Sequence, residues 1–223
     1  ITGIEPGYIR HDFNPTTGVD TLQTVTIEGK SEVIFVLQWQ DPALSASGPP
    51  GADTDLDMFL YNEAGTVALA GSTINNLGGD PVEVFGYTNT SSSSQTYQVS
   101  IEHYSGPLPQ TIKYVYYGNL TVREYDTSSS TLYGHANAAG AVATGAARYD
   151  LTPAFGTSPP LIAPYSALGG TPILFDLNGN PVNIIRQKPE IVAPDGVSTT
   201  FFGFDSSIDL DSYPNFFGTS AAA

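Results

Sequence analysis

The chain has 223 residues, 40% of them hydrophobic, which is enough for a core in one large or two modest domains. Its 22 acidic and 7 basic residues give a net charge of −15, which argues against nucleic acid and anionic membranes as partners because phosphate binding requires lysine and arginine. No apolar run reaches the roughly 20 residues of a membrane-spanning helix, and the absence of cysteine excludes disulfides, zinc–thiolate sites and a cysteine protease mechanism.

Residues 1–20 are polar and interrupted by glycine and proline, which predicts an entry segment ahead of a folded domain. The start, Ile1-Thr2-Gly3, is neither a signal peptide nor an initiator sequence and indicates a mature or excised segment. Serine, threonine, glycine, asparagine and proline are abundant and only 13% of the residues are charged. This composition is typical of secreted, turn-rich β-proteins, so we expect a secreted, extracellular protein.

Residues 21–122 predict an antiparallel, jelly-roll-like β-sandwich. Polar and apolar residues alternate at period two, turn residues separate the runs, and no useful helical period is present. Trp39 is interpreted as a core residue, with sugar stacking as the alternative, and His11 and His103 as surface groups on or near the sandwich. The predicted strands are 22–27, 33–39, 56–61, 66–70, 81–87, 96–104 and 110–117.

Three aspartates, Asp53, Asp55 and Asp57, alternate along one predicted strand and would share a face. Three carboxylates on one face repel one another and need solvent, hydrogen bonds or a hard cation such as Ca²⁺. The glycine and the distant glutamate of an EF-hand loop are missing, and an oxygen-only site needs more ligands than this run supplies. A solvated or structural role and a structural calcium site both remain open.

Residues 123–133 contain the polar run 126–131 and predict a linker. From Gly134 onward the composition changes to small residues, mainly alanine and glycine. Within this region the run Ala141 to Ala146 predicts a buried strand of an α/β sheet. Another short strand, Glu190 to Ala193, is expected between two prolines. The expected fold class is therefore mainly β, with an incomplete α/β segment over 134–223 after the sandwich.

The last stretch is Phe217-Gly218-Thr219-Ser220 followed by three alanines. Gly218 permits a tight turn, and the alanines begin a helix with Ser220 in its first turn. A serine there has free backbone N–H groups beside its hydroxyl, which suits a nucleophile and half of an oxyanion hole. Taken alone, the same residues describe a flexible terminus.

Two sets of motifs resemble known families. The sandwich is similar to bacterial domains of the pre-peptidase C-terminal type, through LQWQDP (37–42), DLDMFLY (55–61), DPVE (80–83) and YQVSI (97–101). The later region resembles the C-terminal part of the subtilisin-like serine protease domain, through GHANAAGA (134–141), KPEIVAPDG (188–196) and FGTSAAA (217–223). The second resemblance implies that Ser220 is the catalytic serine, with its own N–H as one oxyanion donor, and that the sandwich is an accessory domain inserted in the protease.

The family's triad aspartate, triad histidine and oxyanion asparagine motifs are all missing from these residues. Asp126, His135 and Ser220 follow the family order, but nine residues cannot build the strand and crossover that separate the acid from the base. We therefore expect a portion of a secreted serine endopeptidase that acts through an acyl-enzyme on polypeptide substrates. It would need no cofactor for its chemistry, and it would be inactive without the N-terminal part of the catalytic domain.

The alternative function is a non-catalytic secreted binding module that recognises protein or carbohydrate. A structural or adhesive β-protein is the third, weaker interpretation.

Overall fold

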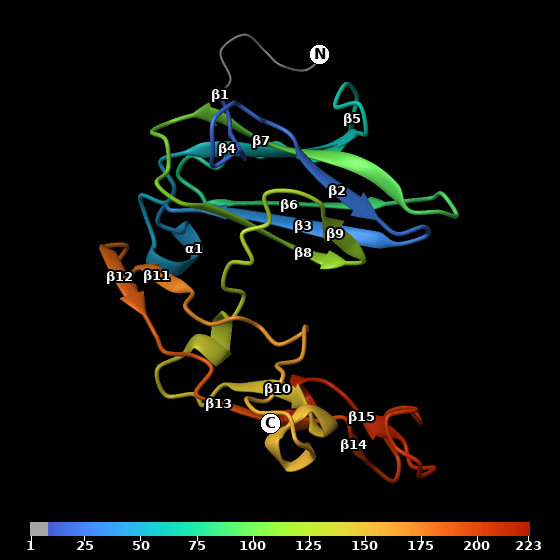
Figure 1. Cartoon of the computed structure of the whole chain (residues 1–223). Coiled ribbons are helices and arrows are strands. Elements are labelled where there is room, and N and C mark those ends of the chain that lie inside the picture. Colours follow the sequence, from blue (N-terminus) through green and yellow to red (C-terminus); the bar gives the residue numbers. More distant parts are fainter. Residues whose placement is uncertain (1–8) are drawn as a thin grey trace. The chain divides into compact units, whose positions relative to one another are not determined.

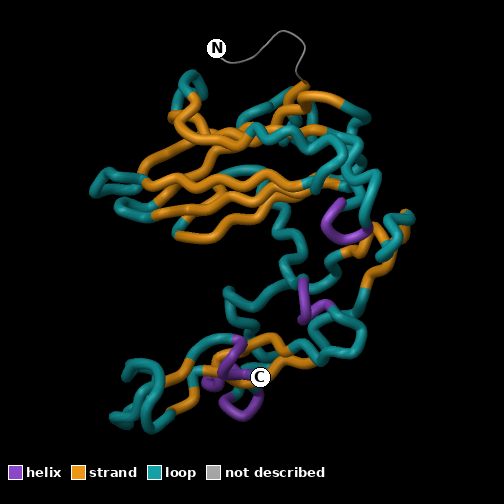
Figure 2. Tube along the Cα trace, turned by 180° about the vertical axis from the view of Figure 1, so that it is seen from behind, coloured by secondary structure: helices purple, strands orange, loops and turns teal. Residues whose placement is uncertain are grey.

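The computed structural model describes residues 9–223, so the first eight residues of the predicted entry segment lie outside the described part. The chain is mainly β, as predicted, and strands account for most of its regular structure (Figure 2). Among the described residues no helix is long and apolar enough to cross a membrane. The helical segments are α1 (Leu44–Ser47), α2 (Thr219–Ala222) and three short 3₁₀ turns, Gly134–Asn137, Tyr149–Leu151 and Pro153–Phe155.

The chain divides into two compact units. The first contains the residues up to Thr127 together with Leu174–Val182, and the second contains Ser128–Ile173 and Asn183–Ala223. The first unit is the β-sandwich, in which two antiparallel sheets pack face to face (Figure 1).

One sheet of the sandwich has the strand order β5-β4-β7-β2-β9, with β1 also pairing with β7, and the other has the order β6-β3-β8. All seven strands expected between residues 21 and 122 are confirmed. Two short strands, β1 and β9, were not foreseen. The strands are β1 (Ile9–Arg10), β2 (Gln23–Ile27), β3 (Glu32–Trp39), β4 (Asp55–Asn62), β5 (Ala68–Ser72), β6 (Val82–Thr88), β7 (Gln95–Ser105), β8 (Ile112–Gly118) and β9 (Leu120–Val122).

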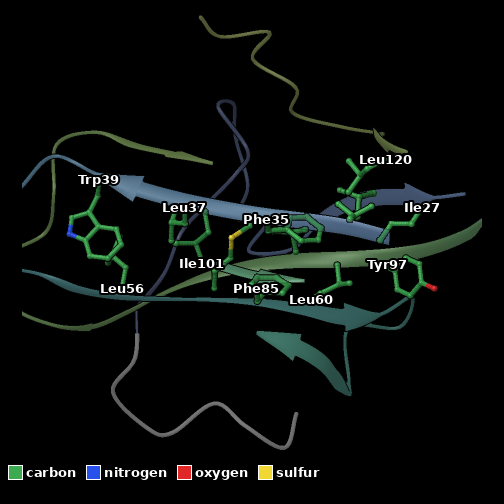
Figure 3. Close-up of a cluster of buried hydrophobic side chains, with 14 residues drawn as sticks. Ile27, Phe35, Leu37, Trp39, Leu56, Leu60, Phe85, Tyr97, Ile101 and Leu120 are labelled. Atoms are coloured by element: carbon green, nitrogen blue, oxygen red, sulfur yellow. The ribbon is translucent and has the colours of Figure 1, made fainter. Parts of the chain in front are cut away.

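The core lies between the two sheets and follows directly from the period-two alternation. In β3, every second residue from Val33 to Trp39 is buried, and Phe35 stacks on Phe85 of β6 with ring centroids 4.9 Å apart. Figure 3 shows side chains of both sheets filling this interior. Full burial of one such side chain is worth about 1.5–3 kcal/mol, so this layer stabilises the first unit. Trp39 is 6% exposed and belongs to this core, as predicted.

The second unit has little regular structure. β10 (Thr144–Arg148) and β13 (Ile191–Asp195) pair in parallel, and β14 (Val197–Ser198) and β15 (Asn215–Phe216) pair antiparallel. Both predicted strands are present, although β10 begins three residues later than expected. A further hairpin joins β11 (Pro172–Phe175) to β12 (Pro181–Ile185), and its central part, Leu174–Val182, is assigned to the first unit.

Candidate functional site

Ser220 lies in the short helix α2, directly after the tight turn at Gly218, whose φ of 118° favours glycine. We call residues 216–220 the Ser220 turn. The serine is exposed and lines an open hollow of about 390 Å³ in the second unit. The other residues of the hollow are His135, Ala136, Ala141, Val142, Ala143, Thr144, Thr219 and Ala223.

A buried carboxylate forms a hydrogen bond to the Ser220 turn. Asp195, the last residue of β13, is 0% exposed, and its Oδ2 accepts the backbone N–H of Gly218 at 2.7 Å. The Tyr165 hydroxyl donates to the same oxygen. Partial burial and then this hydrogen bond raise the pKa of Tyr165 to about 12, so the phenol stays a donor at neutral pH.

The strands that lead to the turn are fixed by backbone and amide contacts. The N–H of Gly196 donates to the carbonyl of Phe216 at 2.8 Å, and the side-chain amide of Asn215 donates to the carbonyl of Gly196 at 3.1 Å. Asn215 is 0% exposed. These contacts tie β14 and β15 together just before the Ser220 turn.

Within the second unit, no acid and base of a triad are assembled around Ser220. His135 lines the same hollow, but within residues 9–223 no hydrogen bond joins its ring to the Ser220 hydroxyl. The geometry therefore offers a positioned hydroxyl without a base to take its proton.

Sequence reasoning did not single out Asp195, Tyr165 or Asn215 as partners of the Ser220 turn. A clue to Asp195 was present, because it lies between a proline and a glycine at the end of a predicted strand, inside the KPEIVAPDG motif. Tyr165 and Asn215 carry no comparable clue. Their roles follow from contacts across 30 and 19 residues of sequence that no local pattern reveals.

The three predicted aspartates of the sandwich have different environments. Asp53 is exposed, Asp55 is 3% exposed, and Asp57 is half-buried. Asp55 accepts the backbone N–H of Asn76 at 3.2 Å. In the described part of the chain, no group of three or more histidine, aspartate or glutamate side chains is arranged to hold a metal ion. A structural calcium ion at Asp53, Asp55 and Asp57 remains a prediction.

Two glutamates, which the sequence did not connect with these aspartates, lie close enough to Asp57 to affect its pKa. Burial, followed by the nearby charges of Asp55, Glu83 and Glu102, raises the pKa of Asp57 to about 7. Glu83 is 0% exposed, and burial also raises its pKa. Glu102 lies opposite Asp57 in the β4–β7 pairing and forms a 2.8 Å ion pair with Arg10. Strand register brings Glu102 to Asp57, whereas Glu83 lies on β6 of the other sheet and approaches through the packing of the two sheets.

The sandwich has a cavity of its own, of about 290 Å³. His11 and His103, expected near the surface of the sandwich, both line it. Burial lowers the pKa of His11, and the charge of Asp12 opposes that shift. The other polar residues that line the cavity are Arg10, Asp12 and Gln110. The apolar lining residues are Ile9, Leu56, Ile101, Leu108, Pro109 and Ile112.

Comparisons with known proteins assign no family: no protein-family model matches the chain, and no curated protein matches it. Function must therefore be inferred from the chain's own residues and geometry.

Proposed function

We propose that Ser220 is the nucleophile of a secreted, subtilisin-like serine endopeptidase and that the β-sandwich is an accessory domain of that protease. The observation that supports this proposal most directly is the Ser220 turn. It presents an exposed hydroxyl at an open hollow, on a backbone that the buried Asp195 fixes at Gly218. The resemblance of the 134–141, 188–196 and 217–223 motifs to subtilisin-like proteases supplies the reaction class.

In this proposal the Ser220 hydroxyl loses its proton to a base and attacks the carbonyl carbon of a peptide bond. The C–N bond breaks, the amine leaves with that proton, and water then hydrolyses the acyl-enzyme to release the carboxylic acid and regenerate the serine. The attack requires a base for the hydroxyl proton and donors for the developing oxyanion. The described residues place no base on Ser220. The triad aspartate and histidine and the second oxyanion donor would come from polypeptide outside these 223 residues. No cofactor takes part in the chemistry, and calcium would have only a structural role at Asp53, Asp55 and Asp57.

The packing of the second unit is consistent with a requirement for additional polypeptide. Its buried apolar side chains are four alanines and a single larger residue, Leu132. Large hydrophobic groups such as Val142 and Phe201 are 71% and 85% exposed. Its parallel sheet has only two strands, whereas parallel sheets are normally larger and covered on both faces. Further strands and helices would bury this surface.

The proposal is tested by proteolysis with the product of the complete reading frame that encodes these residues. We expect cleavage of casein and of fluorogenic peptides, and we expect Ser220→Ala to lower kcat by at least about 10⁴-fold, because losing a nucleophile removes most of the rate enhancement. Ser94→Ala, an exposed serine of the sandwich, is the matched control and should retain full activity. Equal activity in Ser220→Ala and the wild type would rule the proposal out.

The sandwich cavity favours a second candidate, a non-catalytic module that binds protein or carbohydrate. Its lining combines apolar walls with the polar side chains of Arg10, His11 and His103, the usual make-up of a small-ligand site. The same variants distinguish the candidates. A binding module would keep its ligand affinity in Ser220→Ala and would show no proteolysis in the wild type.

A further inference from the structure

We propose that Asp195 is a positioning residue for Ser220: its carboxylate sets the backbone of the Ser220 turn and thereby the direction of the nucleophile. The proposal rests on the proposed function, because it specifies how the same site is built. Asp195 and Gly218 lie 23 residues apart in the sequence, so the contact between them is a long-range one.

The first support is the burial of the carboxylate. Asp195 is completely buried, and its Oδ2 receives both of its hydrogen bonds, from the N–H of Gly218 and from the Tyr165 hydroxyl. Its Oδ1 has no hydrogen-bond partner in the described structure. Removing a carboxylate from water costs free energy, and hydrogen bonds must offset that cost. Asp195 has only two such bonds, so each of them matters to its stability in the interior. Hydrogen bonds to carboxylates are about twice as strong as neutral ones, which makes the Gly218 contact a firm anchor.

The second support is the point at which the hydrogen bonds between β14 and β15 stop. The hydrogen bonds between β14 and β15 extend only to Phe216, through the N–H of Gly196. Beyond Phe216 the chain passes through Gly218, a residue with the widest choice of backbone angles. The Asp195 carboxylate contacts this residue directly, one residue before the Thr219–Ser220 pair. Rotation at Gly218 would swing the Ser220 hydroxyl, and Asp195 restrains that rotation.

The third support is that Asp195 also fixes the segment beside the turn. Tyr165 reaches Asp195 from the segment 163–166. The neighbouring Ser166 accepts the N–H of Ala146 in β10 through its Oγ at 2.7 Å. One carboxylate therefore connects the parallel strands, the 163–166 segment and the Ser220 turn. A displacement of about 1 Å at a reacting group can cost on the order of 100-fold in rate, so this connection bears on catalysis.

The test uses the product of the complete reading frame and compares Asp195→Ala, Asp195→Asn and Tyr165→Phe. Asp205→Asn, an exposed aspartate of the same unit, is the control. At a temperature where thermal scans show every variant folded, we expect Asp195→Ala to lower kcat and the rate of fluorophosphonate labelling about 100-fold, with KM changed less than threefold. Asp195→Asn retains an oxygen that can accept the Gly218 N–H, so its kcat should be about tenfold higher than that of Asp195→Ala. Tyr165→Phe should cost less than tenfold.

A purely structural role would lower the melting temperature without this selective effect on kcat. If folded Asp195→Ala labels and turns over like the wild type, the proposal is wrong. If the wild type neither labels nor cleaves, the proposed function fails instead, and NMR of the same complete product still tests the Asp195 contact. The Gly218 amide proton should be shifted downfield and protected from exchange in the wild type, and should lose both features in Asp195→Ala. Unchanged Gly218 shift and protection in that variant would refute the contact itself.

Discussion

Asp57 lies on β4 beside Asp55 and faces the charges of Glu83 and Glu102. Burial, reinforced by these carboxylates, moves its pKa from 3.8 to about 7. Between about pH 4 and pH 7 the folded protein therefore holds a proton that the unfolded chain releases. The unfolded state binds fewer protons in this window, so the contribution of Asp57 to the free energy of unfolding is greatest below pH 4 and declines as pH rises to 7.

The variant Asp57→Asn removes the ionisation and should abolish this decline. We expect its free energy of unfolding to match that of the wild type near pH 4 and to exceed it by about 2 kcal/mol at pH 8, after allowance for solvent screening. Urea titrations at both pH values measure the difference. Asp53→Asn changes an exposed neighbour and should leave the pH dependence of the free energy of unfolding unchanged. If Asp57→Asn is no more stable than the wild type at pH 8, the raised pKa of Asp57 is contradicted.

The same titrations test the calcium expectation. A calcium ion at Asp53, Asp55 and Asp57 would offset the repulsion between these carboxylates at pH 8. Calcium chloride should then raise the midpoint of the wild type and leave that of Asp57→Asn nearly unchanged.

Asn89 shows how a single buried side chain fixes an element of the sandwich. It is 1% exposed, and its side-chain amide donates to the carbonyls of Ile27, Glu28 and Ser93 at 3.0–3.1 Å, while its Oδ1 accepts the N–H of Ser91 at 3.0 Å. The residue thus closes the turn that follows β2 onto the turn that follows β6. Backbone groups at this end of the sandwich depend on it for their partners.

We expect Asn89→Ala to lower the free energy of unfolding by about 3 kcal/mol, because it leaves buried carbonyls and an N–H without partners. Asn119→Ala is the matched control, since Asn119 is exposed and its side chain makes one long contact of 3.5 Å with Ser31. Its effect should stay within about 0.5 kcal/mol. Chemical denaturation of both variants gives the comparison, and equal losses would show that Asn89 does not hold these turns.

At the scale of elements, the sandwich was predictable because alternation, turn residues and β-branched residues all agree between residues 21 and 122. The short strands β1 and β9 escaped prediction because two or three residues carry no period. The start of β10 was misplaced because a run of alanines and glycines shows no alternation. The candidate nucleophile followed from a motif, whereas its anchor at Asp195 and the carboxylates around Asp57 depend on strand register and tertiary contacts.

At the scale of the whole chain, the two units differ in how much apolar surface each one buries. The sandwich has a continuous core of 14 buried hydrophobic residues. The second unit positions Ser220 but buries little beyond small side chains, and the described residues give that serine no base. The central proposal is that Ser220 is a nucleophile whose acid and base are supplied by polypeptide outside these residues.

Labelling with a fluorophosphonate, followed by mass spectrometry of the modified peptide, tests this claim most directly. The product of the complete reading frame should react at Ser220, and the 223-residue chain alone should not, because an unassisted serine hydroxyl reacts too slowly. Reaction of the isolated chain at Ser220 would show that a working base is already present within it. Absence of reaction at Ser220 in the complete product would show that this serine is not a nucleophile.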